Sequence, residues 1–128
     1  MPITFSNPDG VHKPGSPYSL AALVTGTGRR LVISGQIGMA PDGTVPGTAG
    51  EQMDQALANI GTILAAHGMG PTNLVKMTVF LLSTADVGDW RRRRDTLLQG
   101  HQPASTLLVV SALADPRFLV EIEAEAAD

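Results

Sequence analysis

Apolar residues gather in two stretches near the start of the chain, at residues 19–26 and 30–39, and both stretches predict β-strands. The glycine-rich "TGTG" where the two stretches meet predicts a hairpin turn. Residues 6–19, "SNPDGVHKPGSPYS", contain so many turn-forming residues that they predict an extended, loop-like arm. The pattern therefore predicts an arm followed by a two-stranded hairpin.

A helical period follows the turn cluster "APDGTVPG". Thr48 and Glu51 have the spacing of a capping box, in which each side chain binds an amide that the first helical turn leaves free. Gly68, Gly70 and Pro71 predict where the helix ends. The apolar positions between these signals recur every three or four residues: Met53, Leu57, Ile60 and Leu64. We expect an amphipathic helix of about five turns.

The second half of the chain alternates between strand and helix patterns. Residues 73–83 are almost all apolar or β-branched, which predicts an interior strand covered on both faces. Residues 84–100 predict a shorter second helix, and residues 104–113, after Pro103, predict a further strand. Residues 118–126 alternate apolar positions with glutamates and predict a half-buried strand.

The expected order is ββαβαββ in one domain over residues 1–128, an α+β fold with both helices on one face of the sheet. The second face of the sheet then needs a partner. Oligomerisation would supply that partner.

Composition narrows the classes of protein. Charged residues make up only 16% of the chain, against roughly 25% in an ordinary soluble domain. The net charge of −3 argues against a general nucleic-acid binder. The chain has no cysteine, so disulfides and thiolate chemistry are excluded. The N-terminal residues lack the pattern of a signal peptide, and no apolar run reaches the ~18 residues of a membrane span. We expect a cytoplasmic protein.

Five motifs, taken in order, resemble the Rid family, also called YjgF/YER057c/UK114. They are "PYS", "ISGQIG", "QALANIGTILAAHGMG", "LVKMTVFLLSTADVGDW" and "QPASTLLVV…LVEIEAEA", and together they span nearly the whole chain. The resemblance implies a chorismate-mutase-like fold. It also implies a homotrimer that packs its sheets into a central barrel, with small-molecule clefts between subunits.

The same resemblance implies an activity. Rid proteins are best known for hydrolysing reactive enamines and imines, such as 2-aminoacrylate, to 2-keto acids and ammonia, with no metal or cofactor. Deaminating members carry Pro-Ala-Arg-Ser/Thr, and this arginine forms a bidentate pair with the substrate carboxylate. Here Ser105 occupies that position and Thr106 follows it.

Each residue placed in the cleft by resemblance also has a plainer interpretation. Ser105 either binds a substrate group or only caps the turn into its strand. Tyr18 matches the cleft tyrosine of the family, whereas a lone tyrosine is usually a core or interface residue. Glu121 matches the active-site glutamate that orients or activates water, but by period it belongs to a solvated strand face. Gly35 matches a backbone position lining the cleft, and a glycine within a strand also marks a bulge.

The run "RRRR" at 91–94 is usually a solvated helix face. Four successive helical positions cover all sides, however, so at least one of them must point inward or toward a neighbour. Arg91 aligns with a family cleft position and is a candidate to replace the missing guanidinium. The three histidines have no metal-ligand spacing, and we assign them no role.

Three functions remain open at this stage. The leading hypothesis is a Rid-like enzyme that hydrolyses imines or enamines without the usual arginine clamp. The first alternative is a non-catalytic, small-ligand-binding or regulatory homologue. The third is an endoribonuclease, which the negative charge fits poorly.

Overall fold

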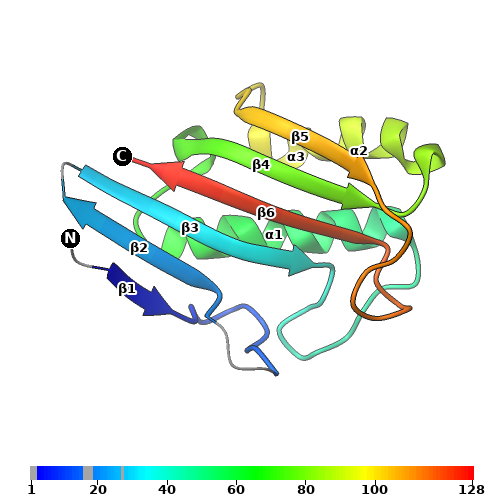
Figure 1. Cartoon of the computed structure of the whole chain (residues 1–128), viewed down its shortest axis with the longest axis horizontal. Coiled ribbons are helices and arrows are strands. Elements are labelled where there is room, and N and C mark those ends of the chain that lie inside the picture. The colour runs from blue at the N-terminus through cyan, green and yellow to red at the C-terminus, as the bar shows by residue number, and fades with distance from the viewer. Residues whose placement is uncertain (1–2, 16–18, 27) are drawn as a thin grey trace.

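The computed structural model describes residues 3–15, 19–26 and 28–128, which form a six-stranded sheet and helices (Figure 1). The strands are β1 (Ile3–Ser6), β2 (Ala21–Gly26), β3 (Gly28–Ile37), β4 (Leu74–Leu81), β5 (Ala104–Val109) and β6 (Val120–Ala127). The α-helices are α1 (Ala49–Ala66), α2 (Val87–Arg93) and α3 (Asp95–Leu98), with 3₁₀ turns at Pro71–Asn73 and Thr84–Asp86.

The strand order across the sheet is β1-β2-β3-β6-β4-β5. The pairings are antiparallel except for β4 with β5, which run parallel and are connected through α2 and α3. The strand that comes last in the chain, β6, therefore lies in the middle of the sheet and joins the β1–β3 half to the β4–β5 half (Figure 1).

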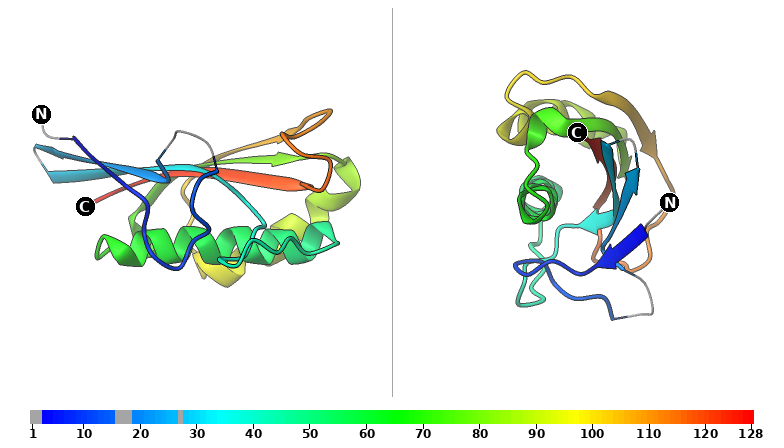
Figure 2. Two further views of the ribbon diagram at one scale, coloured as in Figure 1. Left: turned by 90° about the horizontal axis from the view of Figure 1, so that it is seen from below. Right: turned by 90° about the vertical axis from the view of Figure 1, so that its left-hand side faces the viewer.

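The helices cover one face of the sheet and leave the other face open, as the edge-on view in Figure 2 shows. This arrangement confirms the α+β fold and the placement of both helical segments on one face. Within the single chain the helices cover one face of the interior strand β4, and the expected cover on its second face would come from another molecule. In the single chain, Phe80 and Thr78 on its open side are half-buried and Val75 is 46% exposed.

Three boundaries differ from the sequence-based expectation. The four-residue strand β1 was not predicted, since Ile3–Ser6 is short and its residues remain largely exposed at the sheet edge. The predicted second helix is split at Arg94 into α2 and α3. The strand expected over 104–113 ends at Val109, because only Ala104–Val109 pairs with β4.

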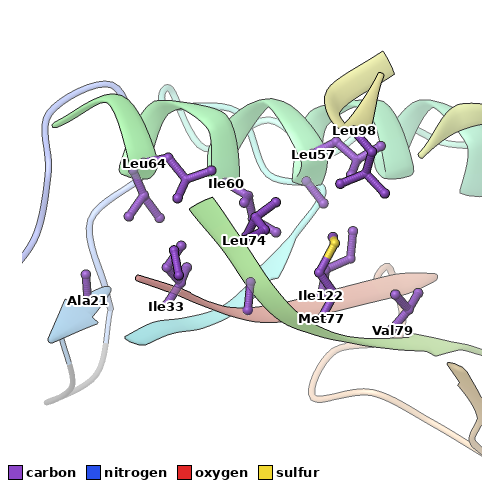
Figure 3. Packing of buried hydrophobic residues seen from close by; sticks show 14 of the residues in the cluster. Ala21, Ile33, Leu57, Ile60, Leu64, Leu74, Met77, Val79, Leu98 and Ile122 are labelled. Carbon is purple, nitrogen blue, oxygen red and sulfur yellow. The ribbon is translucent and has the colours of Figure 1, made fainter. Parts of the chain in front are cut away.

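The core lies between α1 and the sheet. Leu57, Ile60 and Leu64 project from α1 toward Ile33 and Ile122, as Figure 3 shows, and all five are at most 2% exposed. These α1 residues are the ones whose spacing predicted the helix. At the start of α1, the Thr48 hydroxyl accepts a 3.2 Å hydrogen bond from the Glu51 amide, which is one half of the expected capping box.

Polar side chains of α1 fix the loops around the sheet. Gln52 is 1% exposed, and its amide nitrogen donates to the carbonyls of Pro46 (2.8 Å) and Arg117 (2.9 Å). Its carbonyl oxygen accepts from the Leu119 amide at 2.8 Å. Gln52 therefore holds the entrance to β6 against the helix. At Gly38 the backbone passes so close to α1 that a Cβ there would come within 2.6 Å of the backbone carbonyl oxygen of Gln52.

The open face of the sheet carries alternate residues of each strand. On β6 these are Glu121, Glu123 and Glu125, because the intervening residues are buried beneath the helices. Lys76 donates a 2.7 Å hydrogen bond to the Thr106 hydroxyl, and Arg30 pairs with Glu125 at 2.8 Å. Among the described helices, none has the length and hydropathy to cross a membrane.

Candidate functional site

Gly35 and Glu121 lie in contact at a β-bulge. The pairing of β3 with β6 shifts register between Ile33 and Gln36, so Gly35 lies in the irregular segment, and Glu121 pairs with Ile37 just beyond it. A Cβ at Gly35 would overlap a carboxylate oxygen of Glu121 and come within 2.9 Å of its Cδ. The absence of a side chain at position 35 is what allows the Glu121 carboxylate to lie against the β3 backbone.

The Glu121 carboxylate is half-buried, and its surroundings disfavour its charged form. Burial, with a smaller contribution from the negative charge of Glu123, raises its pKa above the usual glutamate value. None of the described residues donates a hydrogen bond that would stabilise its charge, in contrast to Glu125 with its Arg30 partner. A half-buried carboxylate that accepts no hydrogen bond from the described residues can accept a proton from water and return it.

A cavity of about 370 Å³ adjoins Gly35. Its walls come from the N-terminal arm, the end of β3 and the segment before β6, including His12, Lys13, Gln36 and Phe118. Tyr18, the tyrosine that the family resemblance assigns to the cleft, lies outside the described residues.

A second cavity, of about 260 Å³, contains Ser105. Its apolar wall is formed by Met77, Trp90 and Leu98, and its polar wall includes Arg94, Asp95 and His101. The cavity lies between the edge strand β5 and the α2–α3 segment. Ser105 therefore lines a cavity, but not the one that Gly35 lines.

Ser105 and Glu121 face opposite sides of the sheet. Ser105 pairs in register with Met77, whose side chain is buried beneath the helices. Glu121 pairs with Phe80 and faces the open side, as does Thr106, which pairs with Thr78. The structure thus brings Gly35 together with Glu121, and it separates both from Ser105 within one chain.

Comparison with known proteins identifies the family. Residues 11–128 match the family model described as endoribonuclease L-PSP. The chain belongs to the endoribonuclease L-PSP family. This is the family that the Rid and UK114 motifs of the sequence resemble, and a "RutC family protein UK114" of Drosophila melanogaster is 33% identical over 113 residues, covering 87% of this chain and 79% of that protein.

Two further relatives of this L-PSP family chain bear on its site. A Rattus norvegicus protein named 2-iminobutanoate/2-iminopropanoate deaminase is 43% identical over 109 residues, which cover 84% of this chain and 77% of the rat protein. The crystal structure of RidA from an Antarctic Psychrobacter species superposes with a TM-score of 0.88 at 26% identity, covering 98% of this chain and 99% of that one.

The arginine run of this L-PSP family chain divides into paired and unpaired members. Arg93 binds Asp54 at 2.5 Å and Asp89 at 3.0 Å, and Arg92 binds Asp89 at 3.2 Å. Arg91 is exposed and lines none of the cavities described above. Arg94 is the member that reaches the Ser105 cavity.

Arg94 and His101 were missed from the sequence. A run of four arginines does not by itself reveal which of them lines a cavity. Spacing gave a signal for Arg94, however, since it follows the buried Trp90 by four residues and so lies on the same side of the predicted helix. No group of three metal-ligating side chains capable of holding an ion occurs in the described ranges.

Proposed function

We propose that this protein hydrolyses small 2-imino acids to 2-oxo acids and ammonia, with Glu121 as the acid–base group. The observation that carries the proposal is the half-buried Glu121 carboxylate, unpartnered among the described residues and held against the Gly35 backbone. The naming of the rat relative as a 2-iminobutanoate/2-iminopropanoate deaminase supports the same reaction class.

In this reaction Glu121 accepts a proton from water as the water oxygen bonds to the imine carbon. The imine nitrogen takes up a proton from solvent, which gives a tetrahedral carbinolamine. Glu121 then returns its proton to the nitrogen, and the carbon–nitrogen bond breaks as ammonia leaves. The carbinolamine hydroxyl loses its proton to solvent and becomes the carbonyl, so the proton borrowed from solvent is given back. The reaction consumes one water and needs no oxidant, metal or cofactor. A carboxylate whose pKa lies above the usual glutamate value is better suited to both proton transfers than an ordinary one.

The complete site in this proposal lies between subunits. Glu121 faces the open side of the sheet, and Ser105 faces the helices near an edge, so one chain does not bring them to one substrate. A homotrimer that packs its open faces together would place Glu121 of one chain within an enclosed cleft beside a neighbouring chain. Burial in that cleft would exclude bulk water from the reacting imine.

The test is a hydrolysis assay with paired glutamate variants. Serine dehydratase generates 2-aminoacrylate and its imine in situ, and pyruvate release above the spontaneous rate is followed for the wild type, Glu121→Gln and Glu123→Gln. We expect Glu121→Gln to lower the rate by about 10²-fold or more, as loss of an acid–base group does. Glu123→Gln, which removes an exposed charge from the same face of the same strand, should keep the wild-type rate.

Two outcomes would contradict the proposal. A Glu121→Gln variant with full activity would show that Glu121 is only a solvated charge of the strand face, without a role in the reaction. A folded wild type with no rate above background would instead favour a non-catalytic ligand-binding protein, which the serine at position 105 already makes the second candidate. Incubation with RNA in the same buffer tests the endoribonuclease function that the family description names.

A further inference from the structure

The Ser105 cavity holds charges of both signs that remain unpaired with each other. Arg94 and Asp95 are consecutive residues and both line it, yet neither takes part in an ion pair within the described part of the chain. Asp95 uses one oxygen, Oδ1, to accept a 2.9 Å hydrogen bond from the Gly100 amide. Its second oxygen and the whole Arg94 guanidinium remain available to a ligand.

The rest of the cavity supports a small polar ligand. The His101 ring is held by a 2.8 Å hydrogen bond from Nε2 to the Leu74 carbonyl, so it forms a fixed wall. The Ser105 hydroxyl can donate a hydrogen bond from the strand side, and Met77 and Trp90 form an apolar floor. At about 260 Å³ the cavity is below the ≈ 300–1,000 Å³ of typical pockets for drug-sized ligands, which suits a molecule of a few heavy atoms.

From these features we infer that the cavity binds a 2-amino or 2-imino acid, with its carboxylate on Arg94 and its positively charged nitrogen on Asp95. A guanidinium matches a carboxylate geometrically, since it presents two parallel donors. A ligand that carries both charges on neighbouring groups neutralises Arg94 and Asp95 together. A ligand with a carboxylate alone is attracted by Arg94 and repelled by Asp95.

The choice of this ligand class rests on the proposed imino-acid reaction, whereas binding can be measured without turnover. In this arrangement the guanidinium that family deaminases supply from position 105 comes instead from the helix opposite. Ser105 is small enough to leave the space that the Arg94 side chain and the ligand occupy.

Trp90 supplies the measurement. It is the only tryptophan, it is 1% exposed, and it lines the cavity, so its fluorescence reports occupancy directly. The purified protein is titrated with L-alanine, which carries both charges, and with pyruvate, which carries only the carboxylate. We expect the wild type to bind L-alanine more tightly than pyruvate.

Three variants distinguish the roles of the two charges. Arg94→Gln should weaken binding of both probes at least tenfold, the loss typical of a charge-assisted hydrogen bond. Asp95→Asn should weaken L-alanine and strengthen pyruvate, and its amide oxygen still accepts from Gly100, so the local fold is kept. Arg92→Gln is the matched control, because it removes the same charge from a neighbouring exposed position of the same run that does not line the cavity, and it should bind both probes as the wild type does.

The results separate this inference from the proposed function. Absence of any Trp90 response in the wild type at millimolar probe, or an Arg94→Gln variant that binds normally, would overturn the inference. If the wild type hydrolyses imines but Arg94→Gln keeps its KM, the inference fails and the proposed function stands. If alanine binding depends on Arg94 while no hydrolysis occurs, the inference stands and the proposed function fails. An equal effect of Arg92→Gln and Arg94→Gln would indicate a general charge effect and would also overturn it.

Discussion

Gly35 and Glu121 illustrate how a missing side chain shapes a site at the scale of single residues. The pairing of β3 with β6 shifts register around Gly35, and the carboxylate of Glu121 occupies the place where a Cβ would project. The obstructing atoms belong to the flexible end of a glutamate, so a substitution at Gly35 displaces Glu121 more readily than it disturbs the sheet.

We therefore expect Gly35→Ala to reduce the proposed hydrolysis about as strongly as Glu121→Gln does, while thermal unfolding shifts by only a few degrees. Gly47→Ala is the matched control, because a Cβ at Gly47 would meet no atom within 4 Å. Hydrolysis assays and calorimetry on the two variants check this. A Gly35→Ala protein that unfolds at the expression temperature would show that the contact supports the fold instead of the chemistry.

The raised pKa of Glu121 predicts a pH dependence of stability. The folded protein holds the Glu121 proton more tightly than the unfolded chain does. At pH values between the ordinary glutamate pKa and the raised value, the native state therefore binds more protons than the unfolded state. Wild-type stability should therefore fall through that window relative to Glu121→Gln, which has no charge to bury. Below the ordinary glutamate pKa the two proteins should converge. Urea unfolding of both proteins at a series of pH values measures the difference, and a constant difference across the series would contradict the burial of this carboxylate.

At this scale the sequence predicted the face of β6 on which Glu121 lies, because apolar residues and glutamates alternate there, but it did not predict the face of Ser105. The motif resemblance indicated Ser105 and Glu121 together, because it aligns positions without regard to which side of the sheet they occupy. The side is decided by pairing: Ser105 is in register with buried Met77, and Glu121 with Phe80 on the open face. Register between strands distant in sequence depends on tertiary packing.

Among the elements, α1 could be predicted with both of its ends. For α2–α3 the sequence predicted a helical segment but not its division into two helices. The 18 residues of α1 carry a continuous apolar stripe, a threonine cap and a glycine stop, so pattern and local chemistry agree. The later segment buries only Trp90 and Leu98, and it is divided into pieces of 7 and 4 residues. Its short apolar pattern does not specify where the helix breaks. The strand β1 has a similar explanation, since edge residues that stay exposed leave no clear period.

Gln52 connects α1 to two loops, and its replacement should affect the element that carries Glu121. Gln52→Met is nearly equal in volume but leaves the Leu119 amide and the Pro46 and Arg117 carbonyls without their partner. Each buried group left unpaired costs about 1–3 kcal/mol, so we expect a loss of at least ~2 kcal/mol in unfolding free energy. Denaturant unfolding measures it. Gln55→Met, on the same helix but half-buried, is the control and should lose less.

For the whole molecule, the open sheet face is the feature that demands a partner. Ile3 and Phe5 at one edge of the sheet and Leu108 at the other edge lie on this face and are 55%, 66% and 44% exposed. The strand between them, β6, presents Glu121, Glu123 and Glu125 on the same face. The resemblance to Rid proteins predicts a homotrimer with these faces turned inward. The single chain is consistent with that assembly, since its helices leave the face uncovered (Figure 2).

We predict that the protein sediments as a trimer and that Leu108→Asp shifts it toward monomer. Burying an unpaired carboxylate in an apolar interface is strongly unfavourable, whereas the same charge in water is tolerated. Val109→Asp is the control: Val109 is equally exposed at 44% but is in register with Leu81 on the helix side. Sedimentation velocity of the three proteins tests this. A monomeric wild type, or equal dissociation of both variants, would contradict a trimer built on the open face.

The central position of β6 has a consequence for synthesis on the ribosome. Until residues 120–127 have emerged, the nascent chain holds two separate pieces of sheet, β1–β3 and β4–β5, which share no strand pairing. The edges of β3 and β4 that β6 will fill are unpaired during that interval and are able to pair with other chains. Translation that stalls before position 120 would therefore yield aggregation-prone fragments. We expect the nascent chain to depend on chaperone binding until β6 pairs with β3 and β4.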